Sequence, residues 1–254
     1  GGVLLSLWGW RALFLVGVPL GLLAAALAWR YLPADRQSRR SASGAAFWLP
    51  LKDPALRASL AMSALVSAVI MTTFVVGPFY LSRSLGLDAA WMGLAMTVGP
   101  CVSAATGVPA GHLTERLGSQ RMTLVGLGIM AGGALALSQA SALVPYLAAL
   151  MLLTLGYSLF QAANNTAVMS DVDASRRGTI SGLLNLSRNL GLIFGASALG
   201  AVFAWASPEV TRATAQTGAN GLHVTFAVAL ALILAASTFA WRRHSAENSA
   251  QNIR

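Results

Sequence analysis

Two groups of polar residues in this sequence have types and spacings suited to binding a small molecule inside an otherwise apolar protein. They are Gln161, Asn164 and Asn165 in one segment and Asn185, Arg188 and Asn189 in the next. Both follow the spacing i, i+3, i+4, which places the three side chains on one face of a helix. Carboxamides donate and accept hydrogen bonds and a guanidinium only donates, so such faces can bind polar groups of a ligand.

The surrounding sequence is that of a membrane protein. No Asp, Glu, Lys or Arg occurs between Met122 and Ser170, and the whole chain of 254 residues is 56% hydrophobic and 10% charged. Its mean hydropathy of +0.66 excludes a water-soluble globular protein. Cys101 is the single cysteine and stands in an apolar run, so we interpret it as a packing residue, and no metal or other cofactor is expected.

Seven segments are long and apolar enough to cross the membrane. About 20 apolar residues in a helix span the hydrocarbon layer of roughly 30 Å. Turn residues such as Gly, Pro, Asp and Ser separate the segments. The predicted spans are 11–31, 56–82, 90–113, 121–140, 143–169, 179–205 and 221–241.

The basic residues predict the orientation of these spans. Arg and Lys collect in cytoplasmic loops, and 13 of the 17 stand in alternate connections or in the C-terminal tail. We therefore expect the first residue outside and the C-terminus in the cytoplasm, and we attribute the net charge of +9 to topology and not to nucleic-acid binding. The 13 residues are Arg30, Arg36, Arg39, Arg40, Lys52, Arg57, Arg116, Arg121, Arg176, Arg177, Arg242, Arg243 and Arg254.

The polar groups are expected at matching depths. Gln161 precedes the cytoplasmic end of its span by nine residues, and Arg188 follows the start of the next span by nine; both are then about 13 Å deep. An arginine there costs at least ~2.5 kcal/mol unless it is paired or hydrated, and no predicted span contains an acidic residue. Either Arg188 faces a water-filled path or its partner lies elsewhere; alternatively, Arg188 extends to the membrane surface and the asparagines bridge helices.

Other residues are candidates to line the same path. Met71, Phe74 and Tyr157 would add apolar contacts for a ligand. The span 56–82 is also rich in hydroxyl groups, which either line a cavity or join helices, as Ser and Thr commonly do in membranes. These hydroxyl residues are Ser59, Ser63, Ser67, Thr72 and Thr73.

The segment "GHLTERLGSQRM", residues 111–122, joins two spans on the cytoplasmic side. Gly111 permits close approach of a neighbour and Gly118 permits the turn. Glu115, beside Arg116 and Arg121, can pair with an arginine and with the positive end of another helix. Such a clamp would hold only while the cytoplasmic ends of the helices are packed together. An ordinary charged loop explains the same residues.

This segment resembles the motif G-x-L-a-D-R-x-G-R-[RK] of the major facilitator superfamily. Gly111, Leu113, Arg116 and Gly118 match, while Glu115 replaces Asp and Ser119 stands where Arg is usual. The first 33 residues are similar to the end of the fifth helix and all of the sixth in drug:proton antiporters of that superfamily, and residues 176–203 resemble their eleventh helix and the loop before it.

The resemblance implies an all-α integral membrane fold of seven transmembrane helices: the sixth helix plus the C-terminal six-helix half of a twelve-helix major facilitator protein. It divides the chain into the end of the fifth helix with the sixth (1–32), a cytoplasmic central loop (33–55), a six-helix transmembrane domain (56–242) and a cytoplasmic tail (243–254). We expect the N-terminal half of the transporter to precede Gly1. The spans 56–82 and 143–169 would line the cavity.

The expected function is secondary active transport: efflux of small drug-like or metabolite compounds by alternating access, coupled to protons, across the bilayer of a bacterial inner membrane. A sugar or metabolite uniporter or exporter of the same fold, and a non-transporting receptor or scaffold, remain alternatives. A retinal protein is excluded because the only lysine, Lys52, lies in a loop. An enzyme is not expected, since no carboxylate is buried and the histidines lie near span ends.

Overall fold

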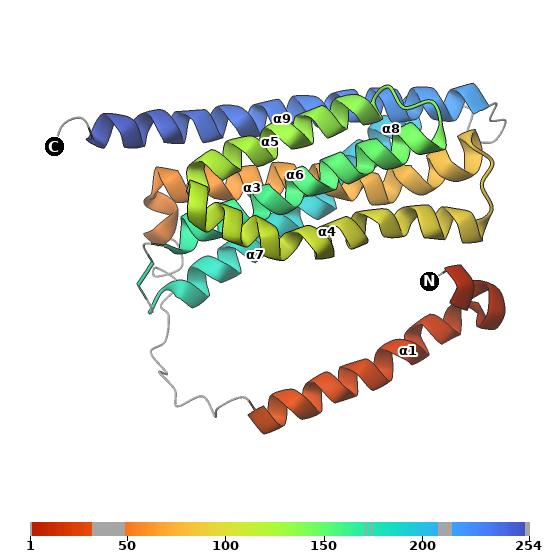
Figure 1. The fold of residues 1–254 in the computed structure, drawn as a ribbon, viewed down its shortest axis with the longest axis horizontal. Coiled ribbons are helices and arrows are strands. Elements are labelled where there is room, and N and C mark those ends of the chain that lie inside the picture. The colour runs from red at the N-terminus through yellow and green to blue at the C-terminus, as the bar shows by residue number, and fades with distance from the viewer. Residues whose placement is uncertain (1, 32–48, 171, 174, 208–214, 252–254) are drawn as a thin grey trace.

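The structure is a computed structural model that describes residues 2–31, 49–170, 172–173, 175–207 and 215–251. The described chain forms long helices that run beside one another, and it contains no strand (Figure 1). Its elements in order are α1 (Gly2–Tyr31), η1 (Leu49–Lys52), α3 (Pro54–Phe79), η2 (Tyr80–Ser84), α4 (Ala89–Leu117), α5 (Ser119–Leu137), α6 (Leu143–Met169), α7 (Arg177–Phe194), η3 (Gly195–Leu199), α8 (Gly200–Ala206) and α9 (Ala215–Gln251).

Six helical segments of the described chain are long and apolar enough to cross a membrane, and each coincides with one of the predicted spans from 56–82 onward. The predicted span 11–31 lies in the 30-residue helix α1, which is not among these six, so a seventh span stays a prediction. The six segments are Pro54–Ser84, Ala89–Leu117, Ser119–Leu137, Leu143–Met169, Arg177–Ala206 and Asn220–Trp241.

Local sequence signals fix where several helices begin and end. Asp53 caps α3 by accepting a hydrogen bond from the backbone N–H of Ala55, at 2.9 Å, and Asp88 caps α4 in the same way from Trp91, at 2.8 Å. Gly118 ends α4 and starts α5 at a φ of 87°, a conformation that favours glycine. The expectation that Gly118 permits this turn is therefore confirmed.

Helix α3 is the centre of the bundle, with α9, α7 and α6 packed around it. Figure 1 shows α9 and α5 along one side of α3 and α6, and α4 and α7 along the other. The core joins α3 to α5, α6 and α9 through side chains such as Met62, Val69, Met130, Leu153 and Phe226. In contrast, little of α4 is buried, and α7 with α8 is also largely exposed.

Two helix pairs meet at glycines. In the α5–α6 pair, Gly126 and Gly156 lie against each other's helix backbone, and Gly133 lies against that of Leu153. In the α3–α7 pair, Gly191 and Gly195 lie against the backbone of α3. Small residues in these positions let the helices approach closely, as is usual in membranes.

The spacing of glycines in the sequence does not by itself identify these contacts. Four pairs of glycines four residues apart suggest tight packing: Gly17 and Gly21, Gly107 and Gly111, Gly128 and Gly132, and Gly191 and Gly195. Only the last pair meets another helix backbone in the described structure. The spacing specifies a shared helix face, and the rest of the fold decides whether that face points at a neighbour.

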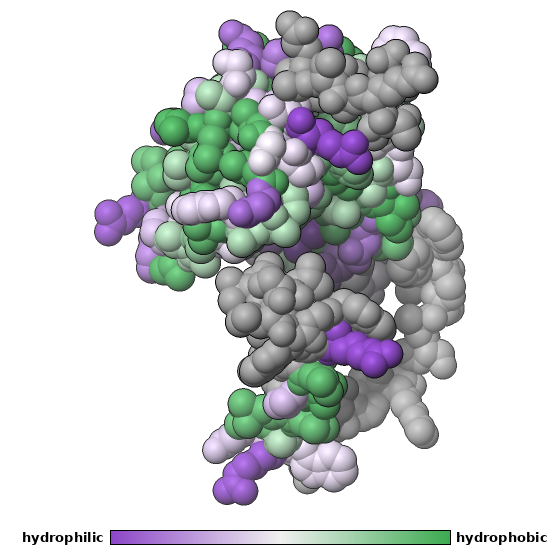
Figure 2. Space-filling model, turned by 90° about the vertical axis from the view of Figure 1, so that its right-hand side faces the viewer, coloured by the Kyte–Doolittle hydropathy of each residue, from purple (hydrophilic) through white to green (hydrophobic). Residues whose placement is uncertain are grey.

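The surface of the described chain is strongly apolar. Figure 2 looks along the helices onto the end that carries the α3–α4 and α5–α6 connections, and apolar side chains extend to the rim of the bundle there. On α1, every side chain that the structure describes is exposed, and the helix contacts α4. Of the predicted central loop 33–55, residues 33–48 lie outside the described chain. Of the predicted tail 243–254, the residues up to Gln251 continue helix α9.

Candidate functional site

The structure brings Gln161 of α6 and Arg188 of α7 into direct contact. With the carboxamide oxygen turned toward the guanidinium, that oxygen accepts from Nη2 of Arg188, and Nε at 2.9 Å and Nη1 at 3.2 Å also lie within hydrogen-bond distance. This orientation of the amide follows from its hydrogen-bond partners. Both side chains are half-buried. The equal depths expected from the sequence therefore correspond to a contact between the two helices.

Packing between α7 and α3 explains why Arg188 points at α6. Ser187 donates a hydrogen bond to the backbone carbonyl of Leu60, at 2.5 Å, and Gly191 and Gly195 continue the same face of α7 along α3. Successive residues of a helix are rotated by about 100°. Because Ser187 faces α3, the next side chain, Arg188, is turned away from α3 and reaches α6.

Tyr157 connects this polar pair to a pocket. It lies one turn before Gln161 on α6, so the two side chains share a face. Since Gln161 contacts Arg188, Tyr157 stands one helical turn from the polar pair. Its ring also lines the pocket, so one side chain borders both features.

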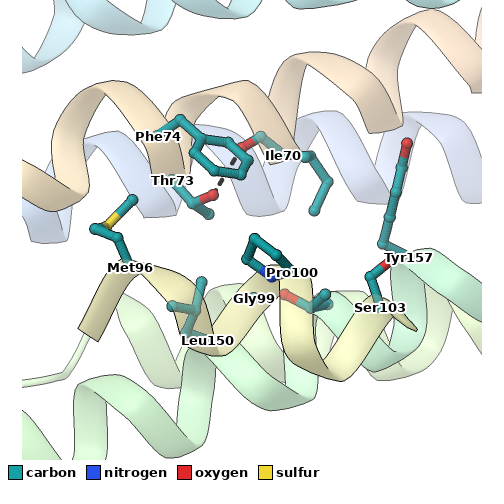
Figure 3. A pocket seen from close by; sticks show the side chains of 10 residues that line it. Ile70, Thr73, Phe74, Met96, Gly99, Pro100, Ser103, Leu150 and Tyr157 are labelled. Carbon is teal, nitrogen blue, oxygen red and sulfur yellow. Dashed lines mark hydrogen bonds between the residues drawn. The ribbon is translucent and has the colours of Figure 1, made fainter. Parts of the chain in front are cut away.

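The pocket lies between α3, α4 and α6 and has a volume of about 260 Å³. Met96 and Tyr157 stand at opposite ends of it, with Phe74 and Ile70 along the α3 side (Figure 3). Most of its surface is apolar, and its polar groups are hydroxyls. It is slightly smaller than typical ligand pockets. The lining residues are Ile70, Thr73, Phe74, Met96, Gly99, Pro100, Ser103, Leu150, Thr154 and Tyr157.

The hydroxyl groups of the pocket are only partly engaged. Thr73 donates to the backbone carbonyl of Ile70 at 2.7 Å, a bond within its own helix that Figure 3 also draws. Ser103 of α4 and Ser158 of α6 are 3.4 Å apart and join those two helices. Each hydroxyl retains further capacity, since it can accept two hydrogen bonds and donate one. The pocket can thus hold an apolar molecule with a few polar atoms.

The other predicted path residues occupy different surroundings. Phe74 and Tyr157 line the pocket, whereas Met71 is half-buried on α3 and does not line it. Asn165 is half-buried, and Asn185 and Asn189 are exposed on α7.

Asn164 differs from the prediction of a hydrated path. It is 1% exposed, and its Nδ2 donates to the backbone carbonyl of Ser59 at 3.4 Å, while its Oδ1 has no hydrogen bond. In this structure Asn164 joins α6 to α3, which is the helix-bridging role considered as the alternative. The physical reason is its position on α6. Asn164 follows Gln161 by three residues, slightly less than one helical turn, so its side chain is offset around the helix from Gln161 and lies against α3.

Most of the predicted hydroxyls of α3 are buried away from the pocket. Ser59, Ser63, Ser67 and Thr72 are buried, and Thr72 donates to the backbone carbonyl of Ala68. Only Thr73 of this group lines the pocket.

Sequence reasoning missed the contribution of α4 to the pocket. Met96, Gly99 and Pro100 come from a helix that looked less polar than α3, α6 and α7. The available signal was the adjacent Gly99 and Pro100 with Ser103 one turn later, since small residues and a proline leave room beside a helix. Cys101, expected to be packing filler, is exposed on α4.

In the segment 111–122, Glu115 makes a contact within its own helix, and the predicted clamp stays a prediction. Glu115 is 76% exposed, and its carboxylate lies 3.8 Å from Nδ1 of His112 on the same helix. Arg116 and Arg121 are exposed, and no other atom lies within 4 Å of where a Cβ on Gly111 would stand. Among the described residues, no three His, Cys, Asp or Glu gather in a way that could hold a metal ion.

Membrane-length helices around a pocket of this kind define a polytopic membrane protein with a small-molecule cavity. The chain belongs to the Major Facilitator Superfamily, whose family model matches residues 1–196. The expected family and the all-α membrane fold are thereby confirmed, and the match points to a transporter.

Individual relatives agree with this assignment. The chain is 28% identical over 292 residues to the Uncharacterized transporter YebQ of Escherichia coli (strain K12), covering 92% of this chain and 62% of the relative. It is 22% identical over 257 residues to the Riboflavin transporter RibZ of Clostridioides difficile (strain 630), covering 80% and 56%. The chain therefore spans about three-fifths of the length of these curated relatives.

A solved structure shares the fold. It is the crystal structure of a bacterial homologue of the human lysosomal transporter Spinster, in an inward-facing and occupied conformation. The TM-score is 0.71 at 16% sequence identity, and the similarity covers 93% of this chain and 58% of that one.

Proposed function

We propose that the complete protein is a secondary transporter that exports small, largely apolar compounds by alternating access. The observation that carries the proposal is the pocket between α3, α4 and α6, which Tyr157 connects to the Gln161–Arg188 pair. A largely apolar pocket with a few polar groups suits compounds of drug or metabolite size.

Transport needs a second half for the described bundle to move against. Secondary transporters of this kind bind near the membrane midplane between two repeats that rock about the site. The little-buried helices α4 and α7 suit the surface that would meet this N-terminal half. We place the protein in a bacterial inner membrane with its C-terminus in the cytoplasm, because the basic loops favour that orientation.

Proton coupling is a separate part of the proposal. It requires a titratable carboxylate at depth, and the acidic residues of the described chain lie at or near helix ends or in connections: Asp53, Asp88, Glu115, Asp173 and Glu247. The coupling carboxylate would therefore belong to the preceding half. Collapse of the proton gradient across vesicles should then stop uptake; unchanged uptake would contradict coupling and favour a uniporter.

The function is tested by transport into proteoliposomes that contain the full-length protein, with small aromatic compounds as substrates. Phe74→Ala should lower transport because Phe74 forms one side of the pocket. The matched control is Phe239→Ala on α9, an exposed phenylalanine outside the pocket. Equal transport rates for both variants would show that substrates do not use this pocket. Absence of uptake above protein-free vesicles would instead favour a receptor or scaffold.

A further inference from the structure

Arg188 is a charged group that the described part of the chain does not neutralise. Within the described residues it contacts the carboxamide of Gln161, which carries no charge. The described acidic residues lie at helix ends or in connections, away from the depth of Arg188. A half-buried cation in a membrane-spanning helix is costly until an anion or water compensates it.

The guanidinium also retains hydrogen-bonding capacity. Arginine carries five N–H donors in a rigid planar fork, whereas the Gln161 oxygen has only two lone pairs. Even if Nε, Nη1 and Nη2 each direct one N–H at that oxygen, two donors remain for another group. A fork of this shape fits a carboxylate or sulfonate, which can accept two parallel hydrogen bonds.

The pocket is connected to this cation along α6. Tyr157 lines the pocket and stands one turn before Gln161, which contacts Arg188, so a molecule in the pocket can extend one end toward Arg188. The rest of the pocket offers Phe74, Met96 and Leu150, which suit an aromatic or aliphatic body. The site therefore has an apolar portion and one positively charged end.

We propose that this site selects small amphipathic organic anions: an apolar body in the pocket and a carboxylate or sulfonate on Arg188. The inference rests on the proposed transport function and adds the charge of the substrate. Gln161 orients the guanidinium without neutralising it, which leaves the positive charge available to an anion. An acidic side chain in the preceding half of the protein would supply a carboxylate to Arg188 in the same way as a substrate. The experiment distinguishes a partner from the protein from a partner on the substrate.

The experiment uses the full-length protein in proteoliposomes and two matched probes, 2-naphthalenesulfonate and the neutral 2-naphthalenesulfonamide. The wild type should take up the sulfonate in preference to the sulfonamide. Arg188→Gln should lower sulfonate uptake by about 10- to 100-fold, because losing a hydrogen bond to a charged group usually weakens binding by about that factor. Sulfonamide uptake should stay within about twofold, which also shows that the variant is folded.

Two further variants separate charge from structure. Arg188→Lys keeps the charge without the planar fork and should retain part of the sulfonate uptake. Arg176→Gln removes the same charge at the exposed start of α7 and should leave both rates unchanged.

The remaining outcomes overturn the inference in distinguishable ways. If the wild type carries the sulfonamide as fast as the sulfonate, or if Arg188→Gln lowers both equally, Arg188 is balanced by a side chain of the protein, and transport stands without anion selectivity. If the wild type carries neither probe, the proposed function fails together with the inference.

Discussion

Gly191 of α7 lies directly against the backbone of Ala64 of α3, so closely that a Cβ atom on Gly191 would overlap the Ala64 carbonyl. The same relationship recurs one turn later between Gly195 and Ala68, and one turn earlier Ser187 donates to the carbonyl of Leu60. Three successive turns, two in α7 and one at the start of η3, are thus held in register with α3. This register determines the direction of Arg188.

Replacing Gly191 by alanine should destabilise the bundle. The added methyl group would overlap backbone and not a flexible side chain, so the helices must separate, at a cost of about 1–3 kcal/mol. The thermal midpoint of the purified protein in detergent should fall. Gly182→Ala is the control, because Gly182 is exposed on the same helix with nothing within 4 Å. Equal midpoints for the two variants would contradict the close packing of α3 and α7.

The sequence was sufficient to locate helices but not the directions in which their faces point. Hydropathy predicts the six spans because each must be apolar along its whole length. Counting residues from the span ends also brought Gln161 and Arg188 to one level, since helix rise is constant. The face of α4 that borders the pocket is determined by how α3, α4 and α6 pack together. The spacing of residues along α4 alone therefore could not predict it.

Asn164 shows the same limit, and it yields a second prediction. Its Oδ1 is buried without a hydrogen bond, so Asn164→Leu removes an uncompensated acceptor, together with the 3.4 Å hydrogen bond to Ser59, while keeping the branching of the side chain. We expect the thermal midpoint to stay unchanged or rise, and transport to continue at the parent rate. A large loss of transport in this variant, with normal thermal stability, would show that Asn164 does belong to the substrate path.

Gln161→Glu should convert Arg188 from a binding group into an internally paired one. The new carboxylate would stand where the carboxamide oxygen now accepts from Arg188, giving a charge-assisted pair. We expect 2-naphthalenesulfonate uptake to fall by about tenfold and 2-naphthalenesulfonamide uptake to persist. Full sulfonate uptake by this variant would show that the anion does not use Arg188.

Glu115→Gln should loosen closure of the cytoplasmic side. We expect Glu115 to interact with a positively charged helix end in the preceding half of the full-length protein when the inner ends are closed. Cysteines placed in the cytoplasmic ends of α4 and α5, in a background with Cys101→Ser, should then react faster with a water-soluble maleimide. His112→Gln is the control for the 3.8 Å contact within α4. Identical labelling rates in the parent and Glu115→Gln proteins would exclude the clamp.

Gly99→Val should reduce the pocket without disturbing the helices around it. A Cβ on Gly99 would stand 3.6 Å from Oγ1 of Thr154, an ordinary contact, and Gly99 lines the pocket, so we expect the γ-methyl groups of valine to extend into its free volume. We expect uptake of naphthalene-sized probes to fall severalfold while single-ring analogues are less affected, with no loss of thermal stability. Gly128→Val on α5 is the control, since Gly128 is exposed and has nothing within 4 Å. If Gly99→Val transports large and small probes at the parent rates, substrates pass without entering this pocket, because a bound molecule of that size could not avoid the added methyl groups.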